Sequence, residues 1–151
     1  MSMEGTTRIE LTDVRTGRTE VREHKNRVTG AVQEIFTPLG LYTSAEMLQP
    51  QDGEDANSPL AYAFGGLLLL DTAVGSSEDA LLIPPGAQIT GTAAHGAPNN
   101  GENRIRGSYN AAESSFDAET GVATFVYDFS TQQANGTIAS VCLTHRSGAY
   151  L

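Results

Sequence analysis

The sequence predicts a mainly β protein: an antiparallel β-sandwich or jelly roll with an N-terminal β-hairpin and one short amphipathic helix. Three observations predict this class. Residues with alternating polarity form several short stretches, most clearly over 122–130. Gly, Pro, Asn and Asp separate these stretches, as turns require. Helical periodicity is clear in one place, over residues 27–36. We expect seven to nine strands and much loop.

The N-terminal residues predict a charged hairpin. Residues 8–14 alternate, with Ile9 and Leu11 on one face of the expected strand. Residues 13–18 then supply a turn in which Gly17 takes a positive φ, and residues 19–23 return as a second strand. The mixed charges favour a solvated surface, because exposed ion pairs contribute little to stability.

A short helix is expected over residues 27–36. Asn26 is a suitable N-cap, and Pro38 and Gly40 end the helix. Its apolar stripe follows the spacing i, i+4, i+7, i+8. The stripe consists of Val28, Val32, Ile35 and Phe36. We expect this helix to plug an open end of the β structure or to seal a subunit contact, so these four residues form the predicted assembly interface.

The middle of the chain predicts strands separated by polar loops. The continuous apolar run 67–70 indicates a strand buried on both faces. A loop follows at 76–79, and Pro84-Pro85-Gly86 marks a turn before the strand expected over 88–94. Residues 51–58 and 95–103 are expected loops, and 104–116 is a weak strand pair or one bent strand.

The C-terminal third contains the strongest strand pattern. Residues 117–121 predict a hairpin connection, with Gly121 at positive φ. The strand 122–130 then places Phe125, Tyr127 and Phe129 on one face, which we interpret as core. A last strand is expected over 137–144. The apolar ending 149–151 suggests that the native chain continues past Leu151.

Two segments are expected: residues 1–40, the hairpin and helix, as a docking element, and residues 41–151, the β body, packing with the first part as one compact domain. Acidic residues outnumber basic ones 18 to 9. Residues 1–36 are neutral, so the rest of the chain carries the whole net charge of −9. Such an acidic body argues against a nucleic-acid partner, because that affinity comes largely from Lys and Arg.

Motifs for membrane targeting or catalysis are missing from the sequence. The N-terminus does not resemble a signal peptide, and the run 65–70 is too short to span a bilayer. A single Cys142 rules out an intramolecular disulfide framework and a Cys-based structural zinc site. His24, His95 and His145 lack metal-binding spacing.

Phosphate-binding glycine loops and the G-x-S-x-G nucleophile motif are likewise absent from the sequence. Among the acids, Glu113, Asp117, Glu119 and Asp128 invite comparison with a glycosidase pair. Two of them fall in the expected turn at 117–121, where Asp is favoured for backbone reasons. The acidic loop 51–55 lacks EF-hand spacing for calcium. We therefore predict no catalytic, cofactor-binding or metal-binding residue, and no cofactor.

Two stretches of the sequence resemble structural proteins of tailed bacteriophages and prophages. The first is the opening, in which Asp13-Val-Arg-Thr-Gly17 separates two strands and Asn26-Arg-Val-Thr29 precedes a helix. The second runs from Phe125-Val-Tyr-Asp-Phe129 through Gln133-Ala-Asn-Gly-Thr-Ile138 to Val141-Cys-Leu-Thr144. The resemblance implies a tail, baseplate or fibre component present in several copies on a virion. Its motifs are structural, so it transfers no functional residue.

Three hypotheses follow. The leading one is a non-enzymatic virion component, made in the host cytoplasm, whose partners are further copies of itself and other virion proteins. The second is a carbohydrate-binding or receptor-binding β-sandwich that recognises a host cell-surface glycan, although the chain has no Trp and only five Tyr to stack on sugars. The third is a glycan hydrolase with a carboxylate pair. None involves nucleic acid or membrane insertion.

Overall fold

The computed structural model describes residues 4–28, 61, 63–75, 83–97, 101–117 and 119–149. The chain divides into two compact units. The first unit contains residues 1–41 and 74–83, and the second contains residues 42–73 and 84–151. The described part is mainly β, and its strand pairs are antiparallel.

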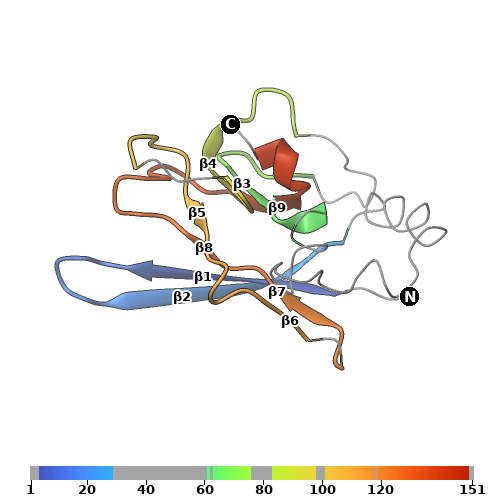
Figure 1. Ribbon diagram of the computed structural model, residues 1–151. Helices are drawn as coiled ribbons and strands as arrows, with labels where there is room; N and C mark the ends of the chain where they lie inside the picture. Colours follow the sequence, from blue (N-terminus) through green and yellow to red (C-terminus); the bar gives the residue numbers. More distant parts are fainter. Residues whose placement is uncertain are drawn as a thin grey trace. The chain divides into compact units, whose positions relative to one another are not determined.

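The first unit contains the predicted hairpin. β1 (Gly5–Thr12) pairs with β2 (Thr19–Asn26) along its whole length, and Figure 1 shows the pair as a long two-stranded ribbon. Seven of the eight β2 residues are exposed. On β1, by contrast, Gly5, Thr7 and Ile9 are partly buried. The hairpin prediction is confirmed, with strands longer than the alternation indicated.

Two turns of the chain share the sequence Asp-x-x-Thr-Gly. In the first, Asp13 Oδ1 accepts the backbone N–H groups of Arg15 and Thr16 at 2.8 and 3.0 Å. Gly17 has φ 67°, and its N–H donates to the Asp13 carbonyl. In the second, Asp117 Oδ1 accepts from Glu119 and Thr120, and Gly121 has φ 69°. The Asp side chain thus supplies the bonds that close each turn, and the Gly supplies the left-handed residue.

Acid is expected to weaken both turns. The pKa of Asp13 is lowered, first by the backbone N–H of Thr16, and that of Asp117 is lowered, first by the Thr120 hydroxyl. A lowered folded-state pKa adds stability above the unfolded pKa of about 3.9, and this stability is lost as the pH falls through the folded pKa. Asp117→Asn keeps the acceptor oxygen without the charge. We therefore expect the wild-type advantage over Asp117→Asn in urea midpoint at pH 7 to shrink at pH 3. An advantage that is equal at both pH values would contradict this explanation.

The second unit is organised around a three-stranded sheet in the order β4-β3-β9. These strands are β3 (Gly66–Leu70), β4 (Ile89–Ala94) and β9 (Ser140–Thr144). Every residue of β3 is buried, which confirms the strand buried on both faces that the apolar run predicts. Gly66 allows β9 to approach, because a Cβ there would lie 2.7 Å from the His145 carbonyl oxygen. The central strand is therefore enclosed by its neighbours and by residues on both faces.

Thr92 of β4 connects three segments of this unit. It is fully buried, and its hydroxyl donates to the Ala149 carbonyl at 2.7 Å, at the end of the 3-10 helix η2 (Arg146–Ala149). Its backbone N–H donates to Ile105, and its carbonyl accepts from Gly107. The outer edge of β4 is thus covered by residues 105–107, which pair there through a parallel bridge.

The predicted strand 122–130 is interrupted, which corrects the expectation of one continuous strand. β6 (Ser115–Asp117) pairs with β7 (Val122–Thr124), whereas β5 (Ser108–Tyr109) pairs with β8 (Tyr127–Asp128). Between β7 and β8 the Val126 N–H donates to Ser114 Oγ instead of to a neighbouring strand. The segment changes partner there, because a side chain has taken over one backbone bond.

The face of residues 122–130 that was predicted to be core is only partly buried. Phe125, Tyr127 and Phe129 are partly buried rather than fully enclosed, and Ala123 on the same predicted face is exposed.

The described part contains nine strands, within the expected seven to nine. The helix predicted over 27–36 lies outside the described residues except for Arg27 and Val28, which are not helical. It stays a prediction.

Candidate assembly surface

The hairpin presents two chemically different faces, because opposite residues of an antiparallel pair share a face. Face 1 contains Gly5, Thr7, Ile9 and Leu11 of β1, with Asn26, His24, Arg22 and Glu20 of β2. On it Thr7 Oγ1 donates to Asn26 Oδ1 at 2.7 Å, and Arg22 pairs with Glu20 at 2.8 Å. Leu11 is 51% exposed although it is a large apolar side chain. Face 1 is therefore the more apolar face along β1.

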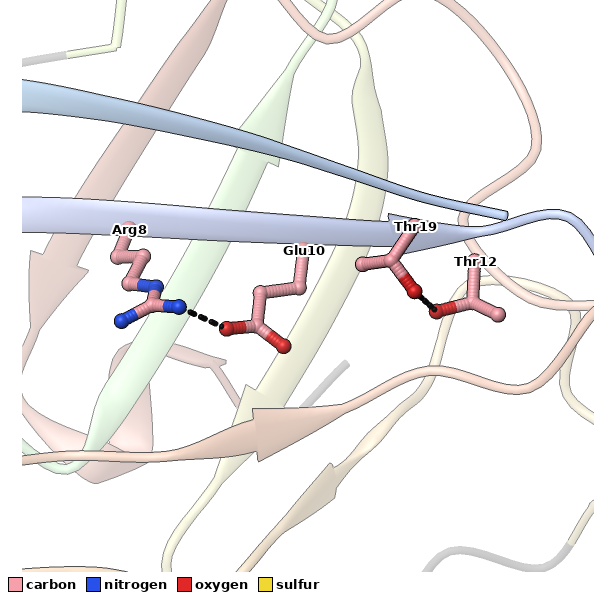
Figure 2. Close-up of polar contacts among 4 residues, drawn as sticks. All are labelled: Arg8, Glu10, Thr12 and Thr19. Atoms are coloured by element: carbon pink, nitrogen blue, oxygen red, sulfur yellow. Dashed lines mark hydrogen bonds and ion pairs between the residues drawn. The ribbon is translucent and has the colours of Figure 1, made fainter. Parts of the chain in front are cut away.

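Face 2 carries the alternate residues, which are mostly charged or hydroxyl-bearing. It contains Thr6, Arg8, Glu10 and Thr12 of β1, with Lys25, Glu23, Val21 and Thr19 of β2. Figure 2 shows two of its contacts: Arg8 pairs with Glu10 at 2.7 Å, and the Thr12 and Thr19 hydroxyls lie 3.0 Å apart. The side chains of Arg8 and Glu10 are 60% and 54% exposed. Such an exposed pair adds little to folding and is available for another partner.

The outer edge of β1 follows from the hydrogen-bond pattern. The Asp13 N–H donates to the Arg18 carbonyl at 2.9 Å, so this pair is hydrogen-bonded, and bonded and non-bonded pairs alternate along the ladder. The backbone groups directed away from β2 are consequently those of Thr6, Arg8, Glu10 and Thr12. No described residue forms a backbone bond with them. β1 thus presents an unpaired edge within the described part of the chain.

A small hollow lies at the base of the hairpin and includes one residue of the predicted interface. Its volume is about 270 Å³, and it is lined by Glu4–Thr6 and Lys25–Val28. Val28 is partly buried there. Val32, Ile35 and Phe36 lie outside the described residues, and the interface of the four residues stays a prediction.

The second unit contains a hollow of about 350 Å³. It is lined by Thr90, Arg104, Ile105, Thr131, Gln132 and Asn135. The loop beside it is held by the buried Gln133, whose Oε1 accepts the Ser130 N–H at 2.9 Å and whose Nε2 donates to the Arg106 carbonyl. Ala134, next in the chain, has φ 52° and donates its N–H to the Arg104 carbonyl. The wall of this hollow is thus fixed by one backbone and one side-chain hydrogen bond to carbonyl groups of the segment 104–106.

Replacement of Gln133 is expected to release this loop. Gln133→Met keeps the side-chain length but removes the amide oxygen and nitrogen, so the Ser130 N–H and the Arg106 carbonyl lose this partner. We expect the free energy of unfolding to fall by about 1–3 kcal/mol, measured by urea denaturation followed by circular dichroism. Gln132→Met, at the exposed neighbouring position, serves as the control and should change it by less than about 0.5 kcal/mol. Equal effects of the two substitutions would contradict the assigned role.

An aromatic cluster also lies in the second unit. The ring of Tyr109 meets His95 and Tyr127 edge to face, with centroid distances of 5.1 and 5.6 Å. Burial raises the pKa of Tyr127 well above its ordinary value, with a smaller contribution from Tyr109. The Tyr127 hydroxyl donates to the Phe64 carbonyl at 3.5 Å. Edge-to-face contacts between partly buried rings are typical of packing.

Two of the four carboxylates considered for chemistry, Asp117 and Asp128, have structural contacts. Asp117 closes its turn, and Asp128 Oδ2 accepts a hydrogen bond from the side-chain amide of Asn110 at 2.9 Å.

Cys142 is half-buried, and burial raises the pKa of its thiol. In the part of the chain that the structure describes, no three His, Cys, Asp or Glu side chains are grouped to hold a metal ion. Among the described residues, no helix has the length and apolar character needed to cross a bilayer.

The edge of β1, unpaired within the described part of the chain, was not predicted from the sequence. The sequence signal for this edge is the alternation Arg8-Ile-Glu10, which places opposite charges two residues apart on one face.

Comparison of the chain with protein-family models, curated proteins and solved structures found no match.

Proposed function

We propose that this chain is a non-enzymatic structural component of a tailed-phage virion or a related tail-like particle, present in several copies. The proposal rests on the resemblance of its two ends to such structural proteins. The observation that carries its assembly role is the hairpin, whose β1 edge is unpaired among the described residues. An isolated two-stranded sheet is only marginally stable in water, so pairing with a further strand would stabilise the hairpin.

The hairpin and the following segment would be the docking part. Val28 lines the hollow at the hairpin base, next to the unpaired strand. The predicted stripe of Val28, Val32, Ile35 and Phe36 would continue this surface into a subunit contact. The second unit would then serve as the exposed body of each copy.

The particle assignment is tested on particles themselves. Tail-like particles induced from a cell that carries the gene are purified by density gradient and analysed by quantitative mass spectrometry. We expect the chain in the particle fraction at several copies per particle. Its absence from that fraction, with the protein recovered only as free monomer, would overturn the proposal.

We also propose that the second unit closes as a β-sandwich or jelly roll. The support is β3, which is buried along its length, because an open single-layer sheet leaves one face to solvent. An experimental structure of the full chain tests this. Strands in two facing layers are expected, and a single open sheet would refute the sandwich.

A further inference from the structure

We propose that two copies of this chain join through their β1 strands, antiparallel and edge to edge, around a two-fold axis at Ile9. The product is a four-stranded sheet in the order β2-β1-β1-β2. This inference deepens the proposed function, on which it rests for the expectation of several copies, by naming the contact between them. The occupant of the edge is a second copy of the same strand.

The backbone geometry permits this pairing. In an antiparallel pair, opposite residues must both direct their N–H and C=O groups at the partner, or both away from it. Arg8 and Glu10 both direct theirs outward from the hairpin, and Ile9 directs its groups at Arg22. With Ile9 opposite Ile9, Arg8 lies opposite Glu10 of the other copy as a hydrogen-bonded pair. The two Arg8–Glu10 pairs then supply four backbone hydrogen bonds.

The side chains fit the same register. On face 2 each Arg8 lies across from the other copy's Glu10, so two opposite-charge pairs form. On face 1 Ile9 meets its own copy, and Leu11 lies across from Thr7. This contact would cover part of the apolar surface of Leu11, which is 51% exposed. The opposite-charge pairs on face 2 and the apolar contacts on face 1 therefore favour the same register, with Ile9 opposite Ile9.

Neighbouring registers are disfavoured by charge. A shift of one pairing step places Arg8 opposite Arg8, and the opposite shift places Glu10 opposite Glu10. Like charges directly across a strand pair are destabilising. The alternation of Arg8 and Glu10 thus specifies the register as well as the partner.

The β2 edge fits a second copy less well. Its outward backbone groups belong to Thr19, Val21, Glu23 and Lys25, by the same alternation. Two registers pair opposite charges: Val21 opposite Val21 pairs Glu20 with Arg22, and His24 opposite His24 pairs Glu23 with Lys25. Each spans only five residues of β2, 19–23 or 22–26, because the turn or the end of the strand intervenes. Longer overlaps place Arg22 on Arg22 or Glu23 on Glu23. The β1 pairing spans residues 6–12 without such a conflict.

Charge reversal tests the alignment with the full chain. After Arg8→Glu both charged residues on face 2 of β1 are Glu, and after Glu10→Arg both are Arg. Two copies of the same variant would therefore bring like charges together. We expect each to raise the dimer Kd about tenfold, measured by sedimentation equilibrium at low salt. An equimolar mixture should recover at least the wild-type affinity as a heterodimer, because both cross pairs are then opposite. Recovery also shows that both variants are folded.

Matched controls separate the β1 edge from other surfaces. Glu20→Arg reverses a charge on the same hairpin that does not face the partner strand, and it should leave Kd unchanged. Glu10→Pro removes an outward N–H of β1 and should abolish the dimer, whereas Val21→Pro removes the equivalent outward N–H of β2 and should retain it. Loss of the dimer in Val21→Pro with retention in Glu10→Pro would overturn the proposal.

A crosslink tests the axis directly. Ile9 opposite Ile9 is a non-hydrogen-bonded pair with a Cα separation of about 4.5 Å, within the range for a disulfide. In a Cys142→Ser background, Ile9→Cys should give a covalent dimer on mild oxidation. Leu11→Cys should not, because the two Leu11 residues would lie about 14 Å apart along the strands.

The outcomes distinguish this inference from the proposed function. A wild-type oligomer that is unaffected by Glu10→Pro and by charge reversal would refute the β1 contact and leave the multi-copy component in place. A protein that is monomeric in solution and shows no Ile9→Cys crosslink would also refute the contact. The particle analysis alone then decides the proposed function.

Discussion

Leu70→Ala is expected to lower the free energy of unfolding by roughly 3 kcal/mol. Leu70 is the last residue of β3 and is fully buried. Its truncation removes a large apolar side chain from the central strand and leaves a cavity that the neighbouring strands cannot fill completely. Urea denaturation followed by far-ultraviolet circular dichroism measures the change.

Leu143→Ala is the matched control for this substitution. Leu143 lies on the adjacent strand β9, opposite Leu67, and is 47% exposed. Because much of its side chain already contacts water, its truncation should cost less than about 1 kcal/mol. Comparable losses for the two leucines would show that β3 is not the centre of the core.

Gly107→Ala is expected to destabilise the second unit by about 2–3 kcal/mol, although it adds only one methyl group. A Cβ at Gly107 would lie 2.5 Å from the Asp128 carbonyl oxygen and 2.7 Å from the Phe129 ring. The carbonyl belongs to β8 and cannot rotate away, so the backbone must shift. That shift would also strain the bond from the Gly107 N–H to the Thr92 carbonyl.

Gly75→Ala provides the comparison at a glycine with space around it. A Cβ there would meet nothing within 4 Å, and the residue is exposed. The substitution should be neutral or raise the free energy of unfolding by up to about 1 kcal/mol, because alanine restricts the unfolded chain. A stability of Gly107→Ala within about 0.5 kcal/mol of wild type would contradict the close approach of residues 107 and 128–129.

Local patterns predicted the elements whose determinants lie close together in the sequence. The turns at Asp13 and Asp117 follow from an Asp acceptor and a Gly four residues later. The buried strand β3 follows from an uninterrupted apolar run. The hairpin follows from alternation on both sides of its turn. In each case the residues that favour the element are neighbours in the sequence.

Other features depend on residues far apart in the chain. The strand pattern at 122–130 is strong, yet Ser114 and Asn110 bond to Val126 and divide it. The enclosure of Gly91 and Gly107 depends on Phe129, and the burial of Gln133 depends on carbonyls at 103 and 106. Pattern alone could not identify these partners, because periodicity reports which face a residue occupies and not what covers that face.

The sequence by itself determined the β class, the two Asp-x-x-Thr-Gly turns and the charge alternation along β1, because these depend on backbone preferences and on the two-residue period of a strand. Only the tertiary structure decided which strands pair, where the C-terminal strand pattern breaks and which edge of the hairpin is unpaired among the described residues. Those features depend on contacts between distant segments, whose free energies no local pattern contains.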